Sequence, residues 1–295
     1  MGRHLPVRPS SFERGRDQLL RDGYLVVENA LPPPVLGALE RDLASDFEQM
    51  PFCEGGFYGR RTKRFGRLLA RSAEADRLVR HPLILAIAEA VLAPWCERIQ
   101  LNLTQAIAIH PGALPQLPHR DQDLWRGPTG EIEYLVNVMW PLTPFTEENG
   151  ATLVWPDSHG ARAADSDADA DPRPIELDPG SALLFLGSTL HGAGGNRSAG
   201  VRRGIIISYC LGWLKPYENQ WLAYPPEVAR TFTPELAALV GYRQHRPNLG
   251  NYEGQCPSVL LGADPGNARM GAADELTPDQ QRLVADFVTA QRGAA

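Results

Sequence analysis

Cysteine is rare in this 295-residue chain, and no long apolar run occurs in it. The four cysteines lie far apart without a CxxC pair, which argues against a zinc ribbon and against a disulfide framework. They are Cys53, Cys96, Cys210 and Cys256. No 18 uncharged apolar residues follow one another, and the amino-terminal segment has no apolar run of signal-peptide length. We therefore expect reduced thiols, no membrane span and a cytoplasmic location.

Basic residues do not outnumber acidic ones either. Lys and Arg total 29 against 35 Asp and Glu, and the net charge of −6 argues against a general binder of nucleic acid or anionic membranes. No period of about 20–50 residues repeats, which excludes solenoids and propellers. Hydrophobic residues make up 43% and charged residues 22%, as in ordinary globular proteins, so wholesale disorder is excluded. A small molecule is the favoured partner.

The first part of the chain, about 1–98, is predicted to be mainly helical. The segment SFERGRDQLLRD predicts a helix that ends at Gly23, and a short strand follows from Tyr24 to Val27. Prolines 32–34 fit the first positions of a second helix, whose apolar residues recur at helical spacing. These residues are Val35, Leu36, Leu39 and Leu43. A further helix is expected from about Pro82 to Leu92.

Between about 99 and 214 the pattern changes to short apolar or alternating runs. They read LNLTQAIAIHPG, EIEYLVNVMWPL, ATLVWP, SALLFLG and VRRGIIISYCLGW, and Gly, Pro, Asn and Asp separate them. Short strands without helical segments between them favour a sandwich or barrel over a parallel sheet. The predicted fold class is therefore mainly β with flanking helices. Residues 161–174 are acidic and aperiodic, and we expect a solvated loop without chemistry there.

The last part, about 215–295, is loop-rich and aromatic and ends in a predicted helix. Thr277 as N-cap, Pro278 at the first helical position and Gln280 three residues after the cap form a capping-box pattern. The apolar face of this helix is expected to pack on the core. It consists of Leu283, Val284, Phe287 and Val288. No convincing linker divides the chain, so one domain over 1–295 is expected.

A His-x-Asp pair and a distant histidine form the candidate metal site. His119 and Asp121 lie at i and i+2, so both side chains project from the same face of an extended segment. His191 ends an apolar run and precedes a glycine-rich turn. Two imidazoles and one carboxylate on a β scaffold are the facial triad that holds Fe(II) and leaves positions open for oxygen chemistry. A closed zinc site would need a fourth protein ligand, usually with thiolates, and no cysteine neighbours these residues.

Arg202 is the candidate partner for an anionic cosubstrate. Fe(II) with one aspartate and two neutral histidines carries a net positive charge, and a dianionic 2-oxo acid would make it negative. A buried arginine could balance this charge and hold the far carboxylate through two parallel hydrogen bonds. Arg202 and Arg203 point to opposite faces of a regular strand, so one of them faces inward, and Arg202 is favoured.

These residues carry a resemblance to the phytanoyl-CoA dioxygenase family, non-haem oxygenases that depend on Fe(II) and 2-oxoglutarate. The resemblance includes DGYLVVENALPPPVLGALERDL, TKRFGRLLARS, the His119–Asp121 motif, ENGATLVWPDSHG, His191, Arg202 and GWLKPYENQWL. The last of these is similar to a subgroup rich in natural-product enzymes. The resemblance implies a double-stranded β-helix core, that is, a cupin-like jelly-roll.

The resemblance also implies a role for each matching residue. His119, Asp121 and His191 would bind Fe(II), and Arg202 would hold the distal carboxylate of 2-oxoglutarate. Gln116 and Thr152 would contact the cosubstrate. The implied cofactors are Fe(II), 2-oxoglutarate and O2, with ascorbate as an aid in vitro. Dimerisation through the aromatic C-terminal region is expected by similarity alone.

Several residues are expected to face the substrate, a mid-sized organic molecule with apolar bulk. They are Arg61, Lys63, Asp123, Trp125, Trp213 and Trp221. Which of Thr62, Lys63 and Arg64 points inward is left open. A coenzyme A thioester is disfavoured because there is no obvious basic cradle. The predicted reaction is hydroxylation of a small molecule, with desaturation, epoxidation or ring formation as variants, in secondary metabolism, with release of succinate and CO2.

Two other readings stay open. One is a cupin-like isomerase or hydrolase that uses Zn or Mn at the same triad without 2-oxoglutarate, and Arg202 and Gln116 argue against it. The other is a degenerate barrel that only binds ligands, and the complete triad argues against that.

Asp157 and His159 form a second i, i+2 pair, but they lie in a turn and are disfavoured as metal ligands. Halogenation is disfavoured because it requires a small residue in place of Asp121.

Overall fold

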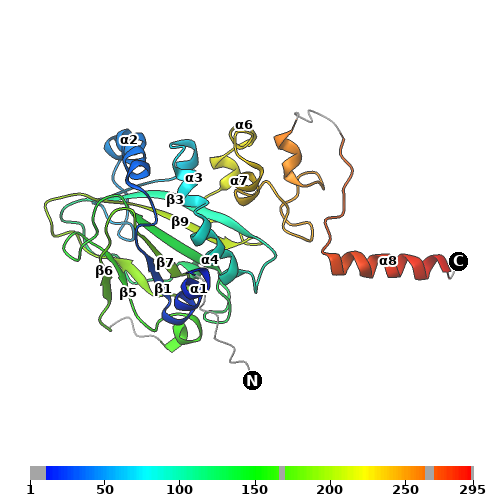
Figure 1. Cartoon of the computed structure of the whole chain (residues 1–295), viewed down its shortest axis with the longest axis horizontal. Coiled ribbons are helices and arrows are strands. Elements are labelled where there is room, and N and C mark those ends of the chain that lie inside the picture. The colour runs from blue at the N-terminus through cyan, green and yellow to red at the C-terminus, as the bar shows by residue number, and fades with distance from the viewer. Residues whose placement is uncertain (1–10, 166–169, 263–268, 294–295) are drawn as a thin grey trace, which may run out of the picture.

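Two opposed antiparallel sheets form the centre of the molecule (Figure 1). The computed structural model describes residues 11–165, 170–262 and 269–293. The larger sheet has the strand order β1-β7-β4-β9-β3-β2. Its strands are β1 (Tyr24–Val27), β2 (Thr62–Phe65), β3 (Ile99–Ile109), β4 (Leu135–Pro141), β7 (Ala182–Leu186) and β9 (Arg202–Leu211). The smaller sheet has the order β6-β5-β8, with β5 (Thr152–Val154), β6 (Arg173–Ile175) and β8 (His191–Ala193).

Every pair of neighbouring strands in both sheets runs antiparallel. The neighbours come from distant parts of the chain, since β7 lies between β1 and β4, and β9 between β4 and β3. Isolated bridges at Phe145–Leu177 and His119–His191 add pairing beyond the regular strands. This arrangement agrees with the predicted mainly β, jelly-roll fold class.

The larger sheet buries a different core on each of its two faces. On its outer face, strand residues such as Val138, Leu184 and Ile207 belong to the main hydrophobic core. On its inner face, the alternate residues, such as Met139 and Phe185, belong to a smaller cluster that also contains residues of the smaller sheet. The period of two along each strand therefore separates the two cores.

All helices except the C-terminal one cover the outer face and the ends of the sheets, and the C-terminal helix projects away from them (Figure 1). They are α1 (Ser11–Asp22), α2 (Pro33–Gln49), α3 (Ala75–Val79), α4 (Pro82–Leu92), α5 (Gln220–Ala223), α6 (Pro226–Ala229), α7 (Pro234–Leu239) and α8 (Pro278–Gly293). Short 3-10 turns occupy Leu68–Ala70, Asp121–Leu124, Gly160–Asp165 and Pro257–Leu261. No helix among the described residues is both long and apolar enough to cross a membrane.

Local signals in the sequence placed several helix ends correctly. Gly23 has φ 79°, which a glycine adopts without strain, and α1 ends just before it. His81 accepts a hydrogen bond from the Ile84 backbone N–H through Nδ1 and so caps α4. The Thr277 hydroxyl accepts from the Gln280 backbone N–H, and the Gln280 side chain accepts from the Thr277 backbone N–H. The predicted capping box is therefore confirmed.

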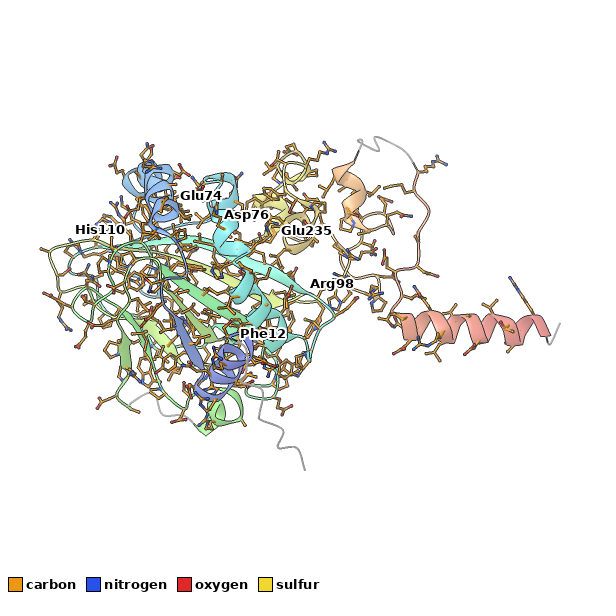
Figure 2. All side chains as sticks on the ribbon, in the orientation of Figure 1. Phe12, Glu74, Asp76, Arg98, His110 and Glu235 are labelled. Carbon is orange, nitrogen blue, oxygen red and sulfur yellow. The ribbon has the colours of Figure 1, made fainter. Side chains whose placement is uncertain are left out.

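Two predictions about the periphery were wrong. Residues 161–174 are not a plain loop, because the 3-10 turn Gly160–Asp165 and strand β6 enter the stretch from either side; residues 166–169 lie outside the described part of the chain. The apolar residues of α8 do not pack on the core, and this helix has no buried residue. Its side chains stand clear of the body (Figure 2). Helical spacing predicts an apolar face, but it says nothing about the distance between that face and the core.

Candidate metal centre

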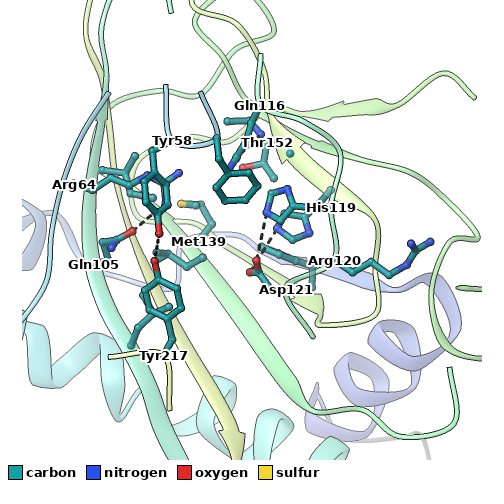
Figure 3. A pocket seen from close by; sticks show the side chains of 18 of the residues that line it. Tyr58, Arg64, Gln105, Gln116, His119, Arg120, Asp121, Met139, Thr152 and Tyr217 are labelled. Carbon is teal, nitrogen blue, oxygen red and sulfur yellow. Dashed lines mark hydrogen bonds and ion pairs between the residues drawn. The ribbon is translucent and has the colours of Figure 1, made fainter. Parts of the chain in front are cut away.

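A cavity of about 460 Å³ opens between the inner faces of the two sheets (Figure 3). Strands β3, β4 and β9 supply its apolar walls through inward-pointing side chains. These are Leu103, Ile107, Ile109, Met139 and Ile206. Its polar lining contains His119, Asp121, His191, Arg202, Gln116 and Thr152. The structure thus brings every predicted metal and cosubstrate residue to one cavity.

Backbone pairing places the two imidazoles side by side. The His119 N–H donates to the His191 carbonyl at 2.9 Å, and the His191 N–H donates back to the His119 carbonyl at 3.0 Å. Asp121 follows two residues later, at the start of the 3-10 turn. Its Oδ1 lies 3.3 Å from His119 Nε2, and its Oδ2 lies 3.6 Å from His191 Nε2. One ligand atom from each of the three residues lies within 4.8 Å of the others, which is close enough to share an ion.

Hydrogen bonds hold each ligand side chain in a binding orientation. His119 Nδ1 lies 2.8 Å from the Leu117 carbonyl, and His191 Nδ1 lies 3.1 Å from the Thr189 carbonyl. In the neutral form of each ring, the nitrogen beside the carbonyl oxygen carries the proton, which leaves the Nε2 lone pair for a metal. The Asn137 amide donates to Asp121 Oδ2 at 3.0 Å. This partner of the carboxylate was missed by the sequence reasoning, although the alternation of LVNVMWP places Asn137 inward.

The charges of the three residues suit metal binding. Burial lowers the pKa of His191 to about 4, so this imidazole is neutral at pH 7. Burial would raise the pKa of Asp121, but the nearby imidazoles and Arg64 outweigh it and lower the pKa to about 2. Burial also opposes the charged form of His119, and the neighbouring Asp121 carboxylate outweighs it and raises the pKa of His119. The carboxylate is therefore ionised wherever the protein is folded near neutrality.

Arg202 is buried in the cavity wall without an anionic partner. Its side chain is 2% exposed, its Nε has no hydrogen-bond partner, and no carboxylate of the described residues forms an ion pair with it. The guanidinium carbon lies 3.5 Å from the centre of the Phe145 ring. Burial and the charge of Arg64 lower the pKa of Arg202 to about 9, which still leaves it cationic at pH 7. A buried, uncompensated cation is costly unless a ligand pairs with it.

Arg203 lies on the opposite side of β9. Its guanidinium carbon lies 5.1 Å from the Phe47 ring centre, on the outer side of the sheet. The preference for Arg202 as the inward residue therefore agrees with the geometry, while its role toward a cosubstrate stays a prediction. Gln116 and Thr152 also line the cavity, and Gln116 Oε1 accepts from the Ala193 backbone N–H at 3.4 Å.

Of the residues expected to face the substrate, Asp123 alone lines this cavity. The three tryptophans use their indole N–H groups to fix loops elsewhere. Trp125 donates to the Lys215 carbonyl, Trp213 to the Trp95 carbonyl and Trp221 to the Gly241 carbonyl. None of the three rings lines the cavity that contains the triad, and their role toward a substrate stays a prediction. Residue type alone could not separate a pocket tryptophan from one that anchors a loop through its N–H.

Arg61 and Lys63 also lie outside this cavity. Arg61 lines a neighbouring hollow of about 310 Å³ and donates to the Pro111 carbonyl at 2.6 Å. Lys63 points toward α2 and donates to the carbonyls of Phe47 and Glu48. Strand alternation explains this placement, because Arg64, which follows Lys63 in β2, points to the other face and lines the cavity.

A polar group lies beside the triad, and the sequence reasoning left its member Arg64 open and missed the other three. It consists of Tyr58, Arg64, Gln105 and Tyr217, which all line the cavity (Figure 3). Gln105 alternates with the apolar inward residues Leu103, Ile107 and Ile109 of β3, and a polar residue in such a series is a signal that could have found it. The two tyrosines sit on loops, where no periodic pattern predicts a direction.

The other histidines have structural roles or lie outside the described residues. His159 of the disfavoured second pair has its Nε2 beside the Leu20 carbonyl, and His110 packs edge-on against Phe52. His4 falls in the segment that is not described. Within the described ranges, His119, Asp121 and His191 are the one group of three His, Cys, Asp or Glu side chains placed to share a metal ion.

Comparison with known sequences supports the same conclusion as the geometry. A family model described as "Phytanoyl-CoA dioxygenase (PhyH)" matches residues 19–204. Dioxygenase trt7 from Aspergillus terreus is 32% identical over 250 residues, which cover 80% of this chain and 86% of the relative. Dioxygenase FrzG from a Cladobotryum species is 32% identical over 258 residues, covering 77% of this chain and 83% of the relative.

Solved structures show the same fold. The non-haem α-ketoglutarate-dependent epimerase SnoN from nogalamycin biosynthesis aligns with a TM-score of 0.57 and 19% identity, covering 69% of this chain and 83% of SnoN. The carbocyclase SnoK from the same biosynthesis aligns with a TM-score of 0.54 and 19% identity, covering 70% of this chain and 88% of SnoK. At this identity the likeness concerns the fold, and it confirms the predicted fold class.

Proposed function

The chain belongs to the phytanoyl-CoA dioxygenase family, and from this premise we propose which residues carry its oxygenase reaction and what it acts on. The enzyme is a non-haem dioxygenase that uses Fe(II), 2-oxoglutarate and O2 to oxidise a small organic molecule, with release of succinate and CO2. A structure of SnoN was determined with Fe3+, α-ketoglutarate and nogalamycin RO, which supports the same cofactor set for this chain.

His119, Asp121 and His191 would hold the iron. The donor set fits, because it consists of two imidazole nitrogens and one ionised carboxylate within 4.8 Å of one another, and a bound metal would take the place of a proton on His119. Three protein ligands leave positions open for a cosubstrate and for O2. Asn137 and the two backbone carbonyls that contact the histidines would keep these ligands in place.

Arg202 would hold the distal carboxylate of 2-oxoglutarate, with Gln116 and Thr152 beside it. The buried guanidinium without an anion is the single observation that carries this assignment. A cupin-like isomerase or hydrolase with a neutral substrate would not need such a cation beside its metal. A carboxylate placed there would receive charge-assisted hydrogen bonds in a site that largely excludes water.

The chain contributes position and charge to the reaction. The bound ion and cosubstrate supply the oxidising chemistry. Arg202 neutralises and orients the cosubstrate, and the apolar wall of Ile107, Met139 and Ile206 keeps water away from the reacting atoms. Hydroxylation is the proposed outcome, with desaturation or ring formation as variants. The placement in secondary metabolism rests on the likeness to enzymes of nogalamycin biosynthesis.

Anaerobic titration tests this function directly. Fe(II) and 2-oxoglutarate added to the wild type should together produce a visible charge-transfer band that neither produces alone. Arg202→Met should require far more 2-oxoglutarate for the same band, whereas Arg203→Met should behave as the wild type. A metal-dependent enzyme without 2-oxoglutarate would give no band, and a ligand-binding barrel would not retain the iron.

Assembly and location are also proposals. We propose a homodimer that uses the aromatic C-terminal region, supported by the exposed aromatic side chains of Trp213, Tyr217 and Trp221. A monomeric mass in sizing chromatography would contradict it.

The four cysteines are all free in the structure, which fits a reducing compartment such as the cytoplasm. We propose a small molecule, not nucleic acid or a membrane, as the partner.

A further inference from the structure

Arg120 lies between two of the three ligand residues but does not point toward them. Its backbone is extended, with φ −114° and ψ 127°, so its side chain leaves the segment on the side opposite to His119 and Asp121. Figure 3 shows this side chain extending away from the imidazoles and the carboxylate. The residue is partly buried, so its guanidinium lies against the protein behind the site.

The guanidinium of Arg120 bonds to two other segments of the chain. Its Nε donates to the Ser188 carbonyl at 2.9 Å, and its Nη2 donates to the Ser158 carbonyl at 3.4 Å. Ser188 lies three residues before His191, between β7 and β8, and Ser158 lies in the turn after β5. One cationic side chain thus connects the segment of His119 with the segment that carries the third ligand. Hydrogen bonds from a charged donor are stronger than those between neutral groups.

The two serines that accept from this guanidinium are themselves fixed. Both are completely or almost completely buried. The Ser158 hydroxyl donates to the Trp155 carbonyl at 2.6 Å, and the Ser188 hydroxyl donates to the buried Glu133 carboxyl. The guanidinium is therefore attached to a rigid part of the fold and not to a free loop.

The turn held by this guanidinium orients the third ligand. The carbonyl of Thr189, which follows Ser188, lies 3.1 Å from His191 Nδ1 and sets the direction of the ring. The Leu190 N–H donates to the Ser158 hydroxyl at 2.9 Å. Each of the two serines therefore also holds the main chain next to His191.

Main-chain hydrogen bonds leave this turn unconnected to the other two ligands. The two segments pair at the reciprocal bonds of His119 with His191, and again where the Gln122 N–H donates to the Gly187 carbonyl at 3.2 Å. Within the described ranges, no main-chain bond joins residues 188–190 to residues 119–122. The Arg120 side chain spans this interval.

We propose that Arg120 is a positioning residue of the metal centre, which fixes His191 relative to His119 and Asp121 before an ion binds. This inference rests on the proposed function, because it takes these three residues as the metal ligands. Ligands that are already held in place bind an ion more tightly than ligands that must first be ordered, because less conformational entropy is lost on binding. Removal of the guanidinium should therefore weaken metal binding.

Metal binding to the apoprotein tests the proposal without turnover. Co(II) is the probe, because its visible absorption depends on the geometry of its ligands. Arg120→Met should weaken Co(II) binding by about 10- to 100-fold, the usual effect of losing a group that orients a metal ligand, and should change the absorption bands. Arg120→Lys can still donate to one carbonyl and should recover part of the affinity. Wild-type affinity and absorption in Arg120→Met would overturn the proposal.

Arg162→Met is the matched control. Arg162 donates to the Asp157 carboxylate and to the Arg21 carbonyl, so it holds the neighbouring part of the same turn without reaching a ligand segment. This variant should keep the Co(II) affinity and absorption of the wild type, even if its unfolding free energy falls as far as that of Arg120→Met. An equal loss of Co(II) affinity in both variants would overturn the positioning role.

Amide hydrogen exchange in the metal-free protein separates this proposal from the proposed function. In Arg120→Met the His191 N–H, which bonds to the His119 carbonyl, should exchange about tenfold or more faster than in the wild type. In Arg162→Met its exchange should be unchanged. An unchanged rate in Arg120→Met would overturn the proposal. A wild type that binds no Co(II) would instead contradict the proposed metal site, and the exchange rates would still report on Arg120.

Discussion

The two faces of the six-stranded sheet are made by the same strands but differ in the charge that they bury. Along β9, the outward residues Ile205, Ile207 and Tyr209 are completely buried against helices, and the Tyr209 hydroxyl donates to the Val79 carbonyl. The inward residues begin with Arg202, a buried cation that forms no ion pair with any carboxylate in the described part of the chain and whose Nε has no hydrogen-bond partner. The outer face is thus packed as an apolar core, while the inner face keeps charge that the protein does not neutralise.

This difference shows where stability and chemistry are located. The outer core holds the strands in register through close apolar packing. That rigidity allows the inner face to keep a triad and two arginines at fixed positions, although each of them is unfavourable without a ligand. Substitutions on the outer face should therefore change stability, and substitutions on the inner face should change binding.

The largest effect is expected at the triad. Asp121→Ala or His119→Ala removes a ligand that no neighbouring group can replace, and succinate production should fall below detection together with bound iron. Metal analysis and a succinate assay check this. The protein should remain folded by circular dichroism, and turnover at the wild-type rate would contradict the assigned ligands.

The next largest effect distinguishes the faces within one strand. Arg202→Met should raise the 2-oxoglutarate concentration for half-maximal turnover by about thirtyfold or more, because a buried charge-assisted pair is worth about 2–5 kcal/mol. Arg203→Met, on the outer side, should change it by less than about threefold. Equal effects of the two variants would show that the inner face was assigned to the wrong arginine.

A large-to-small substitution on the outer face should have the opposite effect, lowering stability and leaving 2-oxoglutarate binding unchanged. Ile207→Ala should lower the free energy of unfolding by about 2–5 kcal/mol, because it leaves a cavity in the main core. Denaturant titration measures this change. The folded fraction should bind 2-oxoglutarate with the affinity of the wild type. A loss of binding free energy larger than the loss of unfolding free energy would contradict the division of roles between the two faces.

A pH-dependent effect is expected at Glu133, which supports the turn before His191. This carboxyl is buried, it bonds to the Ser188 hydroxyl, and burial raises its pKa from 4.5 to about 7. The folded state therefore binds a proton more tightly than the unfolded state, so stability is fully present below pH 4.5 and declines as the pH rises through about 7. Glu133→Gln should remove up to about 3 kcal/mol of this decline, measured as unfolding free energy at pH 5 and pH 8. An unchanged pH dependence would contradict the assignment.

The smallest effect is expected at α8, outside both faces. Phe287 is 64% exposed, and Phe287→Ser should change the free energy of unfolding by no more than about 0.5 kcal/mol. Thermal unfolding at low protein concentration measures it. A larger loss would mean that this helix has a partner surface in solution.

Spacing and alternation predicted much of the fold and the centre of the site. The helix ends at Gly23 and Thr277 could be predicted because capping depends on neighbouring residues. The directions of Arg202 and Arg203 could be distinguished because successive strand residues point to opposite faces. The pairing of His119 with Asp121 followed from the same geometry. These features depend on neighbours within a few residues, which a sequence contains.

Features that depend on contacts between distant parts of the chain could not be predicted from the sequence. The tryptophans at 125, 213 and 221 donate to carbonyls of separate segments, and nothing in their own surroundings gives the direction of the ring. Tyr58 and Tyr217 meet across a separation of 159 residues. The exposed position of α8 likewise depends on the path of the chain before it.

The reciprocal backbone hydrogen bonds between His119 and His191 also bear on how the enzyme acquires its metal. A centre built on main-chain pairing is assembled when the polypeptide folds, before any ion arrives, unlike a zinc finger whose folding awaits its metal. A chelator should thus yield an intact apoenzyme that is ready for reloading. Because first-row divalent ions compete for nitrogen and oxygen ligands, purified material can carry Zn(II) or Ni(II) picked up during expression, well folded yet inactive until exchanged.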